Sequence, residues 1–263
     1  MPYPDFIVAG MTKCGSTSLN HLLRTHPQVH MPRGECHYFD YRYTDGPERY
    51  RKILGLDQAG EGKLIGDTSP GYSNKPEVAG RIHAFAPEVK LIFIMRNPAR
   101  RVFSAYMHAY KKLREARGFE AAMPDLMNAC RFDLKLQPYL ELFPRENIHV
   151  CLLEHLTGET GQQQADAIHD FLGIARRPFG GLEKRNAAKV PVGLPALRAI
   201  NQVPGTGYLV RKLRQVLPAA SHVPKLEPDL YDFMMQEFRP MAQELDRLLG
   251  DDISSAWYPP KQA

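Results

Sequence analysis

Short apolar runs alternate along the chain with longer segments in which apolar residues recur every three or four positions. The short runs predict strands at residues 6–9, 63–66, 91–95 and 148–153. Continuous apolar runs of this length are typical of strands that are covered on both faces, as in a parallel sheet. The longer segments predict helices over residues 16–24, 98–117, 162–172 and 226–249.

The helix expected over residues 98–117 begins with a clear start signal. Asn97 is a good capping residue, and Pro98 suits the first helical position. In the last helical segment we expect Pro240 to kink or break the helix, because proline lacks the N–H donor. Strands that alternate with helices predict a doubly wound, mainly parallel α/β sheet flanked by helices, with ligands beyond the carboxyl ends of the strands.

The length of 263 residues suits a single α/β domain over residues 1–263. A stretch near 33–62 is rich in Tyr, Asp, Arg and Gly, and a stretch near 176–207 is rich in Gly and Pro. We expect both to be loop insertions. Long loops in a compact domain are often lids or binding segments.

Composition changes this picture little. Apolar residues make up 43% of the chain and charged residues 24%, both ordinary for a soluble globular protein. The net charge of +5 is compatible with a nucleic-acid surface or an anionic small substrate. The basic residues form short groups rather than a patch interleaved with aromatic residues, so we expect no nucleic-acid partner.

The four cysteines have neither zinc-site nor disulfide-framework spacing, so reduced thiols are expected. The first residues lack the basic and apolar regions of a signal peptide. The apolar runs are too short to span a bilayer. The sequence therefore predicts a cytoplasmic protein without a transmembrane segment, and it leaves the oligomeric state open.

Residues 10–18 follow the first predicted strand and open the first predicted helix. Glycine lets the backbone turn tightly, and the N–H groups at a helix start face an anion. A lysine adds a full positive charge and three hydroxyls add donors. We therefore predict a phosphate-binding loop formed by Lys13, Cys14, Gly15, Ser16, Thr17 and Ser18.

This loop differs from a Walker A motif, in which a lysine directly follows the second glycine. Gly10 and Gly15 have the Walker A separation, but Ser16 stands at the lysine position. The strand at 91–95 is followed by Arg96 rather than by a metal-binding aspartate. Transfer of a γ-phosphate needs that lysine and its Mg²⁺ ligands. The loop therefore favours a donor whose phosphate is held but not transferred.

A second anion-binding segment begins at the end of the strand at 91–95. Arg96 follows the strand, and Ser104 lies about two helical turns further on. An arginine and a serine beside a helix N-terminus form a good fork for a phosphate. The alternative, in which Arg96 only pairs with an acidic neighbour, stays open.

The two segments together resemble those of the PAPS-dependent sulfotransferases (PAPS is 3′-phosphoadenosine-5′-phosphosulfate). Residues 13–17, Lys-Cys-Gly-Ser-Thr, match the 5′-phosphosulfate loop of that family. Residues 96–106 look like its 3′-phosphate segment, with Asn97 for Asp and an arginine register that admits Arg100 and Arg101. The resemblance implies a P-loop-like nucleotide-binding fold with PAPS as co-substrate and PAP as product.

Within this family, the sequence motifs of the chain most resemble those of the heparan sulfate and related carbohydrate sulfotransferases. Residues 33–40 are similar to their Lys-Glu-x-His-Phe-Phe-Asp segment, and residues 66–72 to the segment Glu-Lys-Ser-Pro-x-Tyr. Thr68 replaces a lysine near the reaction centre, which departs from the heparan type of substrate. The family's basic loop that closes over the nucleotide is matched by Lys184, Arg185 and Asn186.

The resemblance implies in-line transfer of a sulfuryl group from PAPS to an acceptor hydroxyl. Glu35 is the candidate general base from its place in the matched segment, and His37 is the rival, because an unperturbed imidazole titrates near neutral pH. Lys13 would offset charge on the leaving phosphate, and no metal is required. Asp67 and Ser69 are candidates for orienting the base.

The expected acceptor is a carbohydrate-like hydroxyl, on a glycan, a glycolipid or a secondary metabolite. Three tyrosines, Tyr41, Tyr43 and Tyr72, are candidates for lining its pocket. Two functions from other classes stay open. One is a kinase-like phosphoryl-transfer enzyme that uses ATP and Mg²⁺, and the other is a non-catalytic nucleotide-binding protein.

Overall fold

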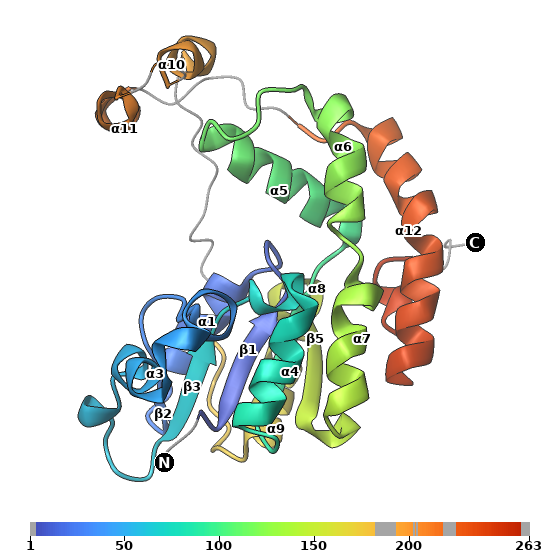
Figure 1. Cartoon of the computed structure of the whole chain (residues 1–263). Coiled ribbons are helices and arrows are strands. Elements are labelled where there is room, and N and C mark those ends of the chain that lie inside the picture. The colour runs from blue at the N-terminus through green and yellow to red at the C-terminus, as the bar shows by residue number, and fades with distance from the viewer. Residues whose placement is uncertain (1–3, 182–192, 202, 204, 218–224, 259–263) are drawn as a thin grey trace. The chain divides into compact units, whose positions relative to one another are not determined.

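The structure, a computed structural model, describes residues 4–181, 193–201, 203, 205–217 and 225–258. Within these residues a five-stranded sheet has the order β2-β3-β1-β4-β5, and every neighbouring pair is parallel (Figure 1). The strands are β1 (Phe6–Gly10), β2 (Val29–His30), β3 (Leu64–Thr68), β4 (Lys90–Met95) and β5 (Ile148–Leu152). The central strand β1 is buried along its whole length, as the continuous apolar pattern predicts.

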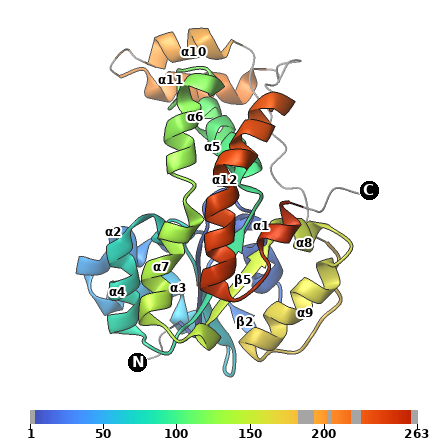
Figure 2. The same ribbon diagram turned by 90° about the vertical axis from the view of Figure 1, so that its right-hand side faces the viewer.

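Helices cover both faces of this sheet (Figure 2). Helices α4 (Pro76–Phe85) and α7 (Phe132–Leu142) pack side by side on one face. Helices α1 (Ser16–Arg24) and α9 (Gly161–Leu172) lie on the other, where His26 Nε2, just beyond α1, is 2.9 Å from the carbonyl oxygen of Ala175, just beyond α9. The prediction of a doubly wound parallel sheet is confirmed.

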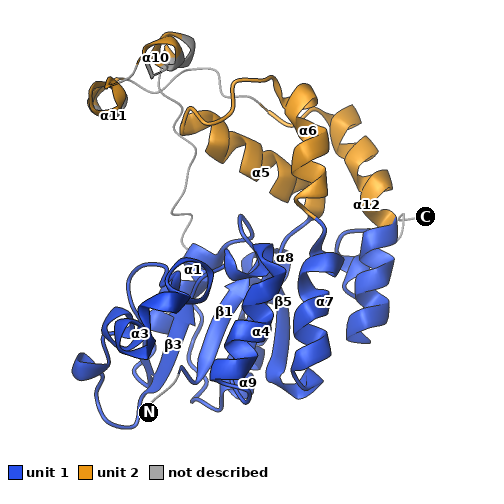
Figure 3. Cartoon of the chain, in the orientation of Figure 1, with its two compact units in different colours: residues 1–97, 131–183, 240–263 blue, residues 98–130, 184–239 orange. Residues whose placement is uncertain are grey.

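The chain divides into two compact units (Figure 3). The first comprises residues 1–97, 131–183 and 240–263 and contains the sheet; the second comprises residues 98–130 and 184–239. The second contains α5 (Pro98–Lys111) and α6 (Phe119–Asn128), which pack around buried Tyr106, Met107 and Ala122. The remaining helices are α2 (Tyr38–Tyr41), α3 (Pro47–Leu54), α8 (Leu153–Thr157), α10 (Leu194–Asn201), α11 (Gly207–Val216) and α12 (Pro228–Leu249).

The expected loop at 33–62 is wrong in part, because α2 and α3 lie within it. Pro47 starts α3, and Tyr50 and Leu54, four residues apart, are its buried residues. Tyr50 stacks on Tyr38 of α2 with ring centroids 4.3 Å apart. The polar composition of this stretch hid a short amphipathic helix whose stability comes from an aromatic cluster formed with distant residues.

Three other boundaries differ from the expectations. The helix at 98–117 ends at Lys111, and α10 lies within the loop expected at 176–207. Helix α12 continues through Pro240, so the expected break does not occur. Gln236, whose carbonyl loses its helical partner, is exposed to solvent. The two-residue strand β2 carries too short a pattern to be recognised in the sequence.

Candidate active site

The predicted phosphate loop connects β1 to α1, and Gly15 caps the helix. Its φ of 98° lies in the left-handed region that favours glycine, and its carbonyl oxygen accepts from Ser18 N at 2.9 Å and Leu19 N at 3.1 Å. A Cβ at Gly15 would lie 2.7 Å from Leu153 Cδ1. The first N–H groups of a helix have no intrahelical acceptor, so this tight turn offers backbone donors to an anion.

The other residues of the loop differ in exposure. Ser16 is buried, Thr17 is exposed, and Lys13 and Ser18 are half-buried. The thiol of Cys14 is buried and donates to Thr12 O at 3.6 Å, so this side chain supports the loop from within. Lys13 has a φ of 68°, an uncommon conformation for a residue with a Cβ. Such backbone strain occurs preferentially at ligand-binding loops.

The end of β3 lies beside this loop. Asn20 Nδ2 of α1 donates to Thr68 Oγ1 at 2.9 Å, and Ser69 N donates to Val8 O of β1 at 3.0 Å. Thr68, which replaces the lysine of the resembled motif, is thus a buried partner of the phosphate-loop helix. Segments 10–20 and 67–72 therefore meet at the carboxyl edge of the sheet, where ligands bind in this architecture.

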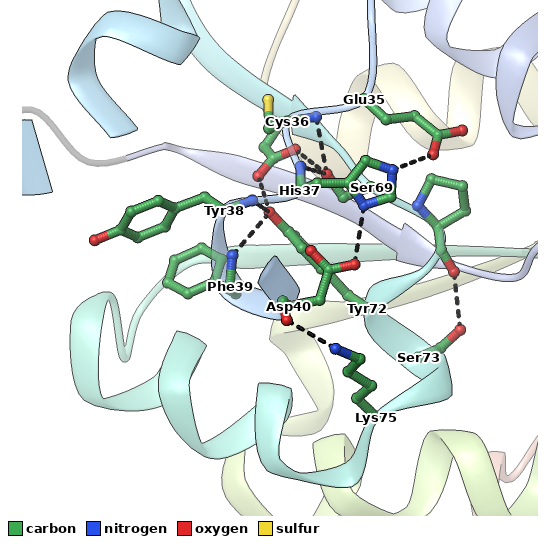
Figure 4. Close-up of polar contacts among 12 residues, drawn as sticks. Glu35, Cys36, His37, Tyr38, Phe39, Asp40, Ser69, Tyr72, Ser73 and Lys75 are labelled. Carbon is green, nitrogen blue, oxygen red and sulfur yellow. Dashed lines mark hydrogen bonds and ion pairs between the residues drawn. The ribbon is translucent and has the colours of Figure 1, made fainter. Parts of the chain in front are cut away.

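A carboxylate–imidazole–carboxylate arrangement lies at the same edge (Figure 4). His37 Nε2 is 2.9 Å from Glu35 Oε2, and His37 Nδ1 is 2.9 Å from Asp40 Oδ2. The side chain of Asp40 is 2% exposed, whereas that of Glu35 is 46% exposed. The outer carboxylate can therefore reach a substrate, and the inner one holds the imidazole.

Each ring nitrogen of His37 faces one carboxylate, Nδ1 towards Asp40 and Nε2 towards Glu35. Asp40 Oδ1 is buried and has no hydrogen-bond partner among the described residues, so the contact with His37 is made by the other oxygen of this carboxylate. The structure thus brings the two candidate bases, Glu35 and His37, into direct contact.

The loop that carries these residues is anchored on the buried side chain of Asp67. Ser69 Oγ donates to Asp67 Oδ1 at 2.9 Å, while Tyr50 OH and Tyr72 OH donate to Asp67 Oδ2 at 2.8 and 2.9 Å. Burial raises the pKa of Asp67, and the hydrogen bonds from Cys36 and from these three hydroxyls oppose that rise. Burial, with the Asp67 charge second, also raises the pKa values of Tyr50 and Tyr72, so both remain protonated donors.

The contacts of Asp67 correct the expectation for Tyr72, and the contacts of His37 identify Asp40 as a site residue that the sequence analysis missed. Tyr72 does not line a pocket, because its ring is fully buried and its hydroxyl is engaged inside the protein. Tyr41 is 70% exposed, and Lys75 Nζ lies 4.1 Å from its ring centroid. Asp40 was missed as a site residue, although it follows His37 by three positions.

Arg96 follows β4 in the first unit and is half-buried. Among the described residues it has no hydrogen-bond or ion-pair partner, which speaks against the alternative of simple pairing with an acidic neighbour. The neighbouring Asn97 N donates to Glu154 Oε1 at 2.9 Å, which fixes the turn after the strand. Arg96 is therefore available to an anion at the carboxyl edge of the sheet.

Ser104, another predicted nucleotide-binding residue, is half-buried on α5 in the second unit. Arg101 is buried and its guanidinium lies 3.4 Å from Leu126 O, whereas Arg100 is exposed. Lys184, Arg185 and Asn186 lie outside the described residues.

Two further features bear on the predictions. All four cysteines are buried, and none forms a disulfide. Within the described ranges, no three or more His, Cys, Asp or Glu side chains are arranged as a metal site. No helix in the same ranges has the length and apolarity needed to cross a membrane.

The fold defines the class of protein, an α/β fold with a parallel five-stranded sheet flanked by helices. A crystal structure of a sulfotransferase from Alicyclobacillus acidocaldarius superposes with a TM-score of 0.70 at 22% identity, covering 97% of this chain and 99% of that one. The sulfotransferase domain from the curacin biosynthetic pathway gives a TM-score of 0.55 at 15% identity, over 90% and 98% of the two chains. These likenesses confirm the predicted fold.

Sequence comparison gives the family. Residues 3–184 match the family model described as the sulfotransferase domain, and the chain belongs to this family. It is 30% identical over 189 residues to heparan sulfate glucosamine 3-O-sulfotransferase 6 of Homo sapiens, covering 66% of this chain and 53% of that protein. It is 39% identical over 105 residues to the membrane-associated sulfotransferase kil1 of Dictyostelium discoideum, covering 39% and 22%. The chain thus spans about half the length, or less, of these curated relatives.

Proposed function

We propose that the chain transfers a sulfuryl group from PAPS to a hydroxyl of a glycan or small-molecule acceptor and releases PAP. The observation that carries this proposal is the contact of 2.9 Å between His37 and the exposed carboxylate of Glu35, at the sheet edge that also holds the phosphate loop. A base and an anion cradle at one edge are what a group transfer to a hydroxyl requires.

The residues present fit a phosphorylated donor. The turn at Gly15 admits no side chain, and the backbone donors of α1 lie at its mouth. Lys13 and Arg96 supply positive charge in the first unit, and Ser104, Lys184, Arg185 and Asn186 remain predicted nucleotide-binding residues. PAPS, when bound, supplies a sulfuryl group attached to a phosphate that can leave.

Glu35 is proposed as the general base that takes the proton of the acceptor hydroxyl. His37, held by Asp40, orients the Glu35 carboxylate and balances its charge. Lys13 and the amides of the loop offset the charge that develops on the leaving phosphate. In this reaction positioning and charge compensation provide the rate enhancement. His37 and Asp40 contribute positioning, and Lys13 with the loop amides contributes charge compensation.

The acceptor is proposed to be a carbohydrate-like hydroxyl, on a glycan, a glycolipid or a secondary metabolite. Several curated relatives carry names of heparan sulfate 3-O-sulfotransferases, which supports a glycan. Thr68 argues against a heparan-type acceptor, because its hydroxyl is buried against Asn20 and offers no positive charge. A cytoplasmic location and a single domain over residues 1–263 remain predictions.

A thermal-shift measurement tests the donor. We expect PAP to raise the melting temperature by several degrees, because a ligand at one hundred times its Kd stabilises the folded state by about 2.7 kcal/mol. ATP with Mg²⁺ should have little effect. Stabilisation by ATP with Mg²⁺ but not by PAP would support the kinase-like alternative instead. A screen of sugars, glycolipids and phenols with ³⁵S-labelled PAPS then identifies the acceptor class.

A further inference from the structure

Four consecutive backbone amides converge on two hydroxyl groups beneath the candidate base (Figure 4). Ser69 Oγ accepts from Cys36 N at 3.1 Å and from His37 N at 3.0 Å. Tyr72 OH accepts from Tyr38 N at 3.0 Å and from Phe39 N at 3.3 Å. These amides belong to the segment that places His37 against Glu35.

Both hydroxyls can accept twice only because their own protons are used elsewhere. A hydroxyl has one proton and two lone pairs. Ser69 directs its proton to Asp67 Oδ1, and Tyr72 directs its proton to Asp67 Oδ2. Because the Asp67 carboxylate accepts both hydroxyl protons, the two lone pairs of Ser69 Oγ and the two of Tyr72 OH can all accept from the amides of residues 36–39.

We propose that Asp67 is a positioning residue for the proposed transfer: through Ser69 and Tyr72 it fixes residues 36–39, and thereby the orientation of His37 against Glu35. This inference rests on the proposed function. Asp67 is fully buried, so it acts on this segment through the two hydroxyls and through its hydrogen bond with the Cys36 side chain. His37 has a φ of 51°, an uncommon conformation that surrounding contacts must hold.

The chain contains a matched control for this idea. Tyr50 OH donates to the same Oδ2 atom of Asp67 as Tyr72 OH, at 2.8 Å. No loop amide is among the contacts recorded for Tyr50 OH in the described structure. Tyr50→Phe and Tyr72→Phe therefore each remove one hydroxyl and one bond to Asp67 Oδ2, and only the Tyr72 hydroxyl accepts from the amides of Tyr38 and Phe39.

The test compares the full chain with Tyr72→Phe, Ser69→Ala and Tyr50→Phe. Hydrogen–deuterium exchange resolved to single amides should be at least tenfold faster at residues 38 and 39 in Tyr72→Phe, and at residue 37 in Ser69→Ala, in which Cys36 N keeps Thr68 O as an acceptor at 3.3 Å. Tyr50→Phe should leave all four rates within about twofold. With PAPS and an acceptor from the screen, kcat should fall about tenfold or more in the first two variants, with KM for PAPS unchanged, and stay within about twofold in Tyr50→Phe.

The outcomes separate this inference from the proposed function. Equal loss of kcat in Tyr72→Phe and Tyr50→Phe, or unchanged amide exchange in Tyr72→Phe, would overturn the positioning role. The positioning role would also be overturned if weaker PAP binding in Tyr72→Phe and Ser69→Ala accounted for their whole loss of activity. If the unmodified protein neither binds PAP nor uses PAPS, the proposed function fails, and the exchange rates of the four amides alone decide whether Asp67 positions the segment.

Discussion

His37 and the buried Asp40 form a pair, with Nδ1 of the imidazole 2.9 Å from Oδ2 of the carboxylate. The pair directs the opposite ring nitrogen of His37 towards Glu35. Three residues that are ordinary by themselves thus form one connected group, in which Asp40 is buried and Glu35 is the most exposed member. Variants of Glu35 and His37 test which of the two residues acts as the base.

Replacing Glu35 by Gln should remove the base without changing its shape. We expect kcat to fall about 100-fold or more, since general base catalysis contributes about 10² to 10⁴. The affinity for PAP should stay within about twofold, because Glu35 lies outside the phosphate loop. Steady-state kinetics with PAPS and calorimetric titration of PAP measure the two quantities.

The variant His37→Ala decides between the two candidate bases. If Glu35 is the base, His37→Ala retains a residual rate above that of Glu35→Gln, because the carboxylate remains and loses only its orientation. A fully active Glu35→Gln together with an inactive His37→Ala would assign the base to His37 instead. Both variants are to be compared at saturating PAPS, so that donor binding does not enter the comparison.

Removing either cation of the proposed donor site should weaken nucleotide binding. A hydrogen bond to a charged group contributes about 1.5–3 kcal/mol, so Lys13→Ala and Arg96→Ala are each expected to raise the Kd of PAP about 10- to 100-fold. Arg51→Ala is the control, because Arg51 pairs with Asp57 on the protein surface. Unchanged PAP affinity in both site variants would contradict the proposed donor site.

Gly15→Ala should damage the phosphate loop locally. The new Cβ would lie 2.7 Å from Leu153 Cδ1 on a backbone with a φ of 98°. We expect a loss of about 1–3 kcal/mol in the free energy of unfolding and a weaker stabilisation by PAP. Gly80→Ala is the control, since Gly80 is exposed on α4 with no atom within 4 Å of the added Cβ. It should raise stability by about 0.5–1 kcal/mol.

His149 should make the fold sensitive to acid. Burial, and secondly the Arg145 charge, lower the pKa of His149 from 6.5 to about 4. Below about pH 6.5 the unfolded chain binds a proton that the folded chain does not bind until about pH 4, so the free energy of unfolding falls as pH falls through this window. The full effect is on the order of 3 kcal/mol.

The variant His149→Phe isolates this contribution from the other titrating groups. The phenyl ring can keep the contact with Phe171, whose ring centroid lies 5.1 Å from that of His149, and it cannot titrate. Urea unfolding at pH 7.5 and at pH 5 should show a smaller loss of stability in the variant than in the unmodified protein. The same loss in both proteins would refute the assignment.

Much of the architecture could be predicted from local pattern alone. The apolar run at 91–95 gave a buried strand, and the turn after residues 6–9 gave a helix that begins at Ser16. Such features depend on neighbouring residues, because the burial of a strand and the conformation of a glycine turn are encoded within a few positions. Helix α3 was missed because its stability comes from stacking between Tyr50 and Tyr38.

The sequence by itself determined the parallel α/β class and the turn before the helix that begins at Ser16, and it pointed to the segment that contains Glu35 and His37. Only the tertiary structure showed that these two residues contact each other and Asp40, and that Ser69 and Tyr72, which both donate to Asp67, accept from the amides of residues 36–39. For the contacts with Ser69 and Tyr72 the physical reason is distance along the chain. Hydrogen bonds between residues more than 30 positions apart depend on how β3 lies beside β1, and no local pattern contains that information.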